Sequence, residues 1–366
     1  MFLTALAAAA IGASSESSPL QDQAYFAILA ETKIGRMAGM PVMDLSGLPP
    51  GIKLPPQAMM FSGKPVRVLN MRLWSPNLAP ADAKASVVPP AGLKQGAKLD
   101  LELYRPSATA GTEKIRDFDP DANPEAFTIK IYWGSSATVK EGQPKVITWK
   151  GLTPEQQEAM KNRMREANAN ASSYYYKPNW TTGFWPTPKQ AGNIDPAASL
   201  VGKYALTTTY TGNVEIEAPS NVNFLNAIEM SSPNLDRKID LKKAIEFKWA
   251  AIPNALGLHA AIMSMEGKNT MVIWTSSEVF TEALMGDMGF LQMAEVRDFV
   301  AKTMFMDGTR TDVTVPAGIF ANADFAMMQM AGYGPGTALE QAQPLPRIQT
   351  KTSLMLMLGG KKMPGG

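Results

Sequence analysis

The sequence predicts a mainly β protein of two antiparallel β-sandwich-like domains, joined by a helix and an aromatic linker. Three observations favour this fold class. Residues 244–275 contain apolar runs that alternate with polar side chains or are bounded by turn residues, as strands are. The 28 prolines and 29 glycines are typical of short strands and many turns. The length of 366 residues exceeds that of one sandwich and suits two domains.

The clearest strand pattern lies in the middle of the expected second domain. Ile245, Phe247 and Trp249 alternate with charged residues, which is the period of a strand with one buried face. Two further apolar runs, residues 258–265 and 271–275, follow turn sequences that contain Pro, Gly and Asn. We therefore expect a three-stranded antiparallel meander with Trp249 in the hydrophobic core.

Shorter patterns of the same kind place the remaining strands. They are predicted at residues 66–74, 99–104, 127–133, 146–149, 204–210, 214–217, 311–315, 325–331 and 347–358. The expected order along the chain is a signal peptide (1–13), a Pro/Gly/Met-rich segment (14–65), a first β domain (66–150), the helix and aromatic linker (151–199), a second β domain (200–358) and a flexible tail (359–366).

Three segments are predicted to be helical. Residues 19–35 carry Tyr25, Phe26, Ile28 and Leu29, which would form the apolar side of a short helix. Thr153, Pro154 and Glu155 are an N-cap, a first-turn proline and a first-turn acid, and they predict a surface helix over residues 153–168. Residues 292–305 show an apolar stripe at helical spacing and form the helix inserted in the second domain.

Composition and charge exclude several function classes. The 35 Lys and Arg nearly balance the 33 Asp and Glu, so no strong field attracts nucleic acid or an anionic membrane. Cysteine is absent, which excludes disulfides, thiolate metal sites and Cys nucleophiles. Residues 1–13 are apolar and end in small side chains, as the core of a signal peptide does, although they lack a basic start. We expect export to the periplasm or beyond, and no transmembrane span.

Several phrases in the chain resemble known secreted proteins. Residues 247–258, FKWAAIPNALGL, resemble the passage between the second and third strands of immunoglobulin-like and fibronectin-like sandwiches in secreted bacterial proteins. Other phrases resemble an uncharacterised family of secreted, β-rich bacterial proteins: IYWG at 131–134, GQP at 142–144, SLVG at 199–202, WTSSEV at 274–279, YG at 333–334 and TKT at 350–352. The resemblance implies secretion and an immunoglobulin-like second domain, without implying an activity.

No complete catalytic motif stands in the sequence. The single histidine, His259, lies on a predicted strand, and no Gly-x-Ser-x-Gly elbow presents a serine to it. We interpret His259 as a packed strand residue. A hydrolase would have to bring distant carboxylates together, and Asp117, Asp119 and Glu125 are the candidates for that role.

Two groups of residues could bind metal. Asp117, Asp119, Asp121 and Asn123 place oxygen-bearing side chains at alternate positions, which suits calcium, or else simply caps turns. Met37, Met40 and Met43 repeat at a spacing of three, in a chain with 24 methionines, and soft thioethers favour copper(I). The later methionines are interpreted as core, and residues 347–358 as a strand that is buried on both faces.

An aromatic cluster in the linker is the third candidate site. Tyr174, Tyr175, Tyr176, Trp180 and Trp185 could stack on sugar rings, or could fill the gap between the two domains. From all of this we expect a non-catalytic exported protein without a resident cofactor, which binds a protein or polysaccharide partner or contributes structure in the cell envelope. The alternatives are a carboxylate-dependent hydrolase and a copper(I)-binding protein.

Overall fold

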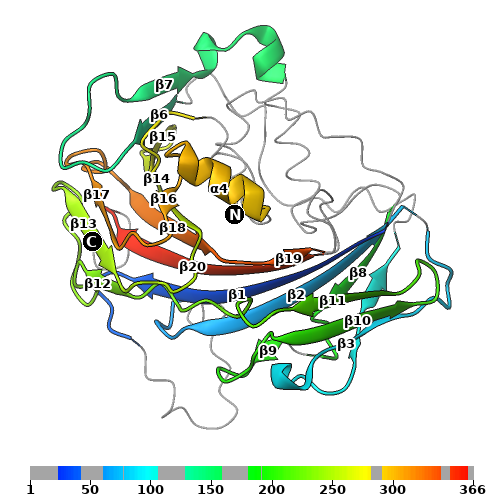
Figure 1. Cartoon of the computed structure of the whole chain (residues 1–366). Coiled ribbons are helices and arrows are strands. Elements are labelled where there is room, and N and C mark those ends of the chain that lie inside the picture. Colours follow the sequence, from blue (N-terminus) through cyan, green and yellow to red (C-terminus); the bar gives the residue numbers. More distant parts are fainter. Residues whose placement is uncertain are drawn as a thin grey trace.

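The computed structural model describes residues 24–42, 61–76, 78–105, 128–158, 180–190, 192–281, 291–338 and 347–361. The fold is mainly β, as predicted, and is built on one curved sheet of 13 strands (Figure 1). A four-stranded and a three-stranded sheet cover one face of the large sheet, here called its outer face. The opposite, inner face is concave and carries the helix α4 (Met293–Ala301) (Figure 1).

The large sheet follows a fixed strand order. Hydrogen-bonded neighbours are, in sequence across the sheet, β5 (Glu102–Tyr104), β8 (Thr181–Trp185), β2 (Val66–Ser75), β1 (Tyr25–Met37), β20 (Arg347–Gly359), β18 (Phe325–Tyr333), β14 (Gly257–Glu266), β15 (Thr270–Thr275), β6 (Thr128–Trp133) and β7 (Lys145–Thr148). Three short strands pair with β2, β14 and β20 respectively: β9 (Asn193–Ile194), β16 (Met306–Asp307) and β19 (Thr337–Ala338).

The two small sheets enclose the main hydrophobic cores. The four-stranded sheet has the order β11 (Val214–Ala218), β10 (Gly202–Thr208), β3 (Ala85–Val88) and β4 (Leu99–Asp100). The three-stranded sheet has the order β12 (Met230–Ser232), β13 (Ile245–Trp249) and β17 (Asp312–Val315). Each packs its apolar face on a different part of the outer face, so two separate cores lie beneath one continuous sheet.

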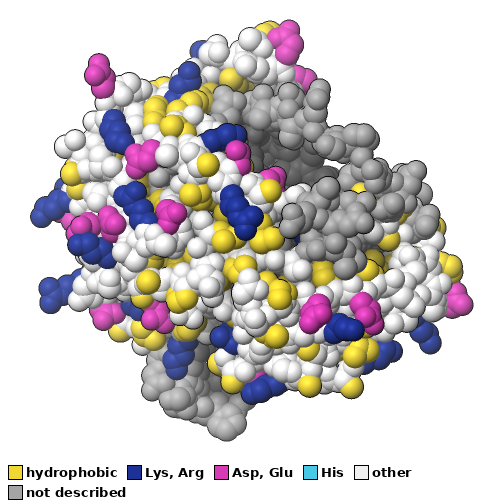
Figure 2. Space-filling model, viewed as in Figure 1, with side chains coloured by type: hydrophobic (Ala, Val, Ile, Leu, Met, Phe, Trp, Pro, Cys, Tyr) yellow, Lys and Arg dark blue, Asp and Glu magenta, His cyan; other side chains and the backbone are white. Residues whose placement is uncertain are grey.

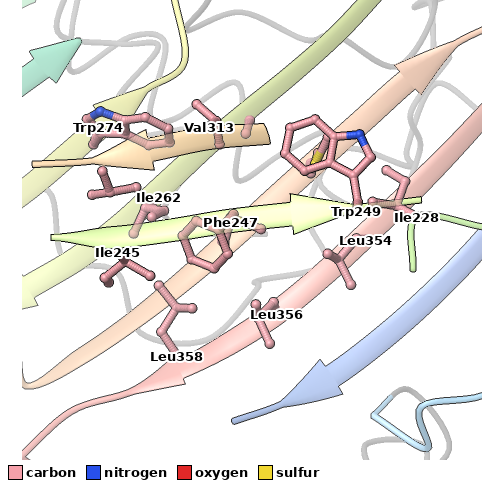
Figure 3. Close-up of a cluster of buried hydrophobic side chains, with 14 of the residues drawn as sticks. Ile228, Ile245, Phe247, Trp249, Ile262, Trp274, Val313, Leu354, Leu356 and Leu358 are labelled. Atoms are coloured by element: carbon pink, nitrogen blue, oxygen red, sulfur yellow. The ribbon is translucent and has the colours of Figure 1, made fainter. Parts of the chain in front are cut away.

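Trp249 lies in the core under the three-stranded sheet, as predicted. Its side chain is 3% exposed and Phe247 is fully buried. Both belong to one buried cluster with Leu354, Leu356 and Leu358 of β20, and Figure 3 shows Phe247 beside Leu356 and Leu358. The alternating burial of β13 confirms that the polar residues between them face solvent.

The predicted meander is wrong in one connection. β14 and β15 form an antiparallel pair, but β13 does not pair with β14. It pairs instead with β12 and β17 in the small sheet. The turn residues between β13 and β14 carry the chain from one layer to the next, and turn chemistry alone does not distinguish that crossing from a hairpin.

The predicted helix at residues 19–35 is also wrong, because its described part is strand β1. This strand runs antiparallel to β2 on one side and parallel to β20 on the other. Its residues are buried on both faces over most of its length. A strand in that position shows no alternation of apolar and polar residues, so its sequence resembles that of a buried helix.

The two-domain arrangement and its linker are not confirmed. β6 and β7 belong to the predicted first domain, yet β6 pairs with β15 of the predicted second domain. β3 pairs in the same way with β10. Part of the predicted aromatic linker is strand β8, in the large sheet. The predicted signal peptide lies outside the described residues.

The other predicted elements are largely confirmed. The helix α4 starts at Met293 behind a capping box of Gln292 and Glu295. A second helix starts at Pro154, where Thr153 accepts a hydrogen bond from the backbone N–H of Gln156 at 3.3 Å. Short 3-10 turns occur at Ala91–Leu93 and Trp149–Gly151. No helix among the described residues combines the length and apolar character of a membrane span.

Replacing Trp249 by alanine should destabilise the fold by about 3–5 kcal/mol, because it removes a large side chain from a packed core and leaves a cavity. Chemical denaturation monitored by circular dichroism measures this change. Lys248→Ala is the matched control, since Lys248 is the neighbouring exposed residue, and its effect should stay within about 0.5 kcal/mol. Equal effects of the two variants would contradict the assignment of Trp249 to the core.

Candidate functional site on the inner face of the large sheet

The inner face is the face of the large sheet that the two small sheets do not cover. The helix α4 occupies part of it, with Val296, Phe299 and Val300 packed against Phe305 and Tyr333 (Figure 1). Gly257 permits this close approach: a Cβ atom there would lie 2.7 Å from Cγ2 of Val300. β20 and the adjoining part of β18 keep half-exposed side chains on this face, whereas β1 is buried there except at Lys33 and Met37.

A polar cluster occupies the centre of the inner face. Ser353 Oγ donates a hydrogen bond of 2.6 Å to Glu31 Oε1. Lys351 Nζ lies 3.9 Å from that same oxygen, and Lys33 Nζ lies 3.2 Å from Glu31 Oε2. The Glu31 side chain is only 7% exposed, so its charge depends on these partners for stabilisation. Lys351 also lies over the ring of Tyr333, with Nζ 5.9 Å from the ring centroid.

A row of methionines crosses the same face. Met37 on β1 is opposite Met357 on β20, and Met357 is opposite Met327 on β18. Met327 in turn is opposite Met263 on β14. Residues that are directly opposite in a sheet share a face and are close enough to touch. We call these residues, Met37, Met357, Met327 and Met263, the methionine row.

The row is buried at one end and open at the other. Met263 is 5% exposed and packs in a small core with Met271, Ile273 and Ile131. Met37 and Met357 are half-buried and belong to none of the hydrophobic clusters of the described residues. The prediction that β20 is buried on both faces is therefore wrong for its inner face, where Ser353, Met355 and Met357 remain partly accessible.

His259 lies beneath α4. Its side chain is 5% exposed, and its ring centroid is 5.3 Å from that of Phe305. Burial lowers the pKa of His259 to about 4, so the imidazole is neutral at physiological pH. In the strand register, Ala331 lies between His259 and Ser353. No serine or carboxylate forms a hydrogen bond with the buried Nε2 atom of His259. The interpretation of His259 as a packed strand residue agrees with this geometry.

A small cavity lies between α4 and the inner face. Its volume of about 10 Å³ gives room for roughly one water molecule. Its lining includes Tyr333, Gln349 and Lys351. The Gln349 side chain donates a hydrogen bond to the carbonyl oxygen of Leu291. This cavity is too small for an organic ligand, so binding to the inner face would use its open part.

The structure places only some of the predicted site residues. Trp185 is fully buried in β8, and Trp180 stacks on Tyr25 at a centroid distance of 5.9 Å. Met40 follows the end of β1 and is 42% exposed. The others lie outside the described residues: Tyr174, Tyr175, Tyr176, Asp117, Asp119, Asp121, Asn123, Glu125 and Met43. Calcium binding and carboxylate-dependent hydrolysis by these residues stay predictions.

Sequence reasoning missed the residues that the structure brings together. Glu31 and Lys33 follow directly on the apolar run of residues 25–30 in β1, and a charge next to such a run is the signal that could have identified them. Lys351 and Ser353 give no such signal, because their neighbours in β20 include the polar residues Gln349, Thr350 and Thr352. The sequence spacing selects Met37, but it carries no sign that Met37 lies opposite Met357, which in turn lies opposite Met327.

Positive and negative side chains are interspersed over the visible face, with hydrophobic ones between them (Figure 2). Within the described ranges, no three His, Cys, Asp or Glu side chains are grouped as metal ligands would be.

Comparison with known proteins gives no relative: the chain matches no family model, no curated protein and no solved structure.

Replacing Glu31 by alanine should destabilise the protein by about 3 kcal/mol, because it leaves Lys351, whose side chain is 16% exposed, without its carboxylate. The matched control is Glu215→Ala, in an exposed pair with Lys203 on β10, for which the expected cost is below about 1 kcal/mol. Denaturant unfolding at pH 7 compares the two. A cost for Glu31→Ala no larger than that of the control would show that the polar cluster does not support the sheet.

Acidification should destabilise the fold through His259. Because the pKa of this imidazole is about 4 in the folded protein and 6.5 when it is exposed to water, the unfolded chain binds the proton first as the pH falls. Stability is therefore lost between about pH 6.5 and 4, by about 3 kcal/mol at most from this residue. Unfolding free energies at pH 7 and 4.5 measure the loss, and His259→Leu should show a smaller loss by about that amount. An identical loss in the variant would assign the effect to other groups.

Proposed function

We propose that this chain is an exported, non-catalytic binding protein of the cell envelope, which holds a protein partner on the open part of its inner face. The observation that carries the proposal is the composition of that surface. A charged cluster centred on Glu31 adjoins half-exposed methionines on β1, β20 and β18. The signal-like residues 1–13 and the resemblance to secreted bacterial proteins support export.

The inner face is favoured over the other described surfaces. The outer face of the large sheet is covered by the two small sheets and their cores. The outward faces of those sheets carry solvated ion pairs, such as Lys248 with Glu246 and Lys203 with Glu215. Exposed pairs of this kind are ordinary surface features and give little binding energy.

A polypeptide suits this surface better than a polysaccharide. Methionine side chains are unbranched and adaptable, and surfaces rich in them accommodate varied apolar side chains of protein partners. Sugar binding by the predicted aromatic platform would need open rings, whereas Trp185 is fully buried and Trp180 stacks on Tyr25. The near balance of charge gives no reason to expect nucleic acid.

Site-specific photocross-linking in intact cells tests this function. A benzophenone amino acid at position 355, on the inner face, should yield one defined protein adduct, which a protease digests. The same group at position 248, on the exposed side of β13, is the matched control and should not give that adduct. The charge reversals Glu31→Lys and Lys351→Glu made together should keep the ion pair but weaken the adduct several-fold.

Two results would contradict the proposal. Equal adducts from positions 355 and 248 would mean that contact is non-specific. An adduct that resists proteases and is digested by glycosidases would identify a polysaccharide partner instead. Absence of the protein from the periplasmic and extracellular fractions would refute the export part independently.

A further inference from the structure

We infer that the open end of the methionine row is a binding site for a soft monovalent metal ion, Cu(I) or Ag(I). The thioether sulfurs of Met37, Met357 and Met327 are the proposed ligands, contributed by the adjacent strands β1, β20 and β18. This inference rests on the inner face being a binding surface, but it does not depend on the protein partner proposed above.

The strand register brings the three ligands together. Adjacent strands lie about 4.8 Å apart, so Met357 on the middle strand is an immediate neighbour of both Met37 and Met327. The methionine side chain has three rotatable bonds and no branch, which allows sulfurs from neighbouring positions to turn toward one point. Three thioethers arranged around an ion satisfy the low coordination number that Cu(I) and Ag(I) accept.

The distribution of residues on β20 argues against a simple packing role. Its outer, buried positions carry leucine, at Leu354, Leu356 and Leu358. Its inner, half-exposed positions carry Met355 and Met357. On this strand leucine serves the core, and Met355 and Met357 belong to none of the hydrophobic clusters of the described residues, so core packing does not account for these two methionines.

The chemistry of the site selects the ion. Thioethers are soft and neutral, so they bind Cu(I) or Ag(I) in preference to hard cations such as calcium and magnesium. No group of His, Cys, Asp or Glu within the described residues competes for the ion. The thioether ligands are neutral, so they do not neutralise the charge of a bound ion. A monovalent ion in a half-exposed site therefore loses less solvation free energy than a divalent ion would. The chain also lacks the cysteines that would otherwise take up Cu(I).

This ligand set revises the site expected from sequence spacing. Met40 lies in the turn after β1, with its backbone N–H bonded to the carbonyl oxygen of Met37 at 3.2 Å. The turn does not continue the strand, whereas Met37 remains in register with Met357. The ion is therefore expected to need β20 and β18, and not the residues that follow Met37 along the chain.

Competition for Cu(I) tests the site in the purified chain. The protein is titrated into the coloured Cu(I) complex of bicinchoninate under anaerobic, reducing conditions, and Ag(I) is measured in parallel by calorimetry. We expect one ion per chain. The variant Met37→Leu/Met327→Leu/Met357→Leu should bind at least about a hundredfold more weakly, because leucine keeps the size of the side chain and removes the sulfur.

Two matched variants make the result specific. Met328→Leu/Met330→Leu alters buried methionines on the outer face of β18 and should bind as the unmodified protein does. Met40→Leu/Met43→Leu removes the rest of the sequence-predicted set and should also leave binding unchanged. Loss of binding in the second variant, or none in the triple variant, would overturn the assignment, as would failure of the unmodified protein to compete for either ion.

Methyl NMR keeps the test decisive if the triple variant does not fold. In the unmodified protein labelled at the methionine methyl carbons, Ag(I) should shift the resonances of Met37, Met327 and Met357, assigned from single leucine variants. The resonances of Met328 and Met330 should not move. A shift confined to other methionines would refute the site. Photocross-linking from position 355 needs no added metal, so its failure would be distinct from failure of metal binding.

Discussion

The parallel pairing of β1 with β20 is the constraint on which the rest of this structure depends. The register runs from Ala27 opposite Arg347 to Met37 opposite Met357, so it joins segments near the two ends of the chain. β1 also contributes to both large cores, through Ile28 in one and Ile34 in the other. The large sheet is therefore continuous only when this pair has formed. Such long-range pairing closes a very large loop, and loop entropy opposes it until the packed cores offset the cost.

The register between β1 and β20 also determines which side chains meet on the inner face. Glu31 contacts Lys351 and Ser353, and Met37 lies beside Met357, although hundreds of residues separate these partners in sequence. Side chains alternate between the faces of a strand, so a shift of one residue would turn each of these groups toward the core. It would also place leucines of β20 on the open side. Burial of the outer-face side chains therefore sets the strand register, and the register in turn fixes the positions of the polar residues and methionines on the inner face.

The sequence predicts strands well where one face is buried and the other is open. β2 and β13 lie within about two residues of their predicted bounds because their alternation reflects that asymmetry. The prediction fails for β1, whose two faces are both covered. It fails again for the partner of β13, because a turn does not specify whether the chain returns to the same sheet. Site prediction fails for a related reason: spacing in sequence selects Met37 but carries no information on which strands lie beside it.

The two faces of the large sheet have different roles: the outer face packs the cores that stabilise the fold, and the inner face carries the charged and sulfur-containing side chains of the candidate site. The outer face holds tightly packed residues such as Trp274 and Ile262, whose replacement the fold tolerates poorly. On the inner face, α4 covers β14 and the near end of β18, and β1 is exposed only at Lys33 and, in part, at Met37, whereas β20 keeps partly exposed side chains along its length. Residues there are held in place by the rigid sheet behind them and need not fill a core. A surface of this kind can carry charge and sulfur ligands at little cost to the fold, since the packing that defines their positions lies on the other side.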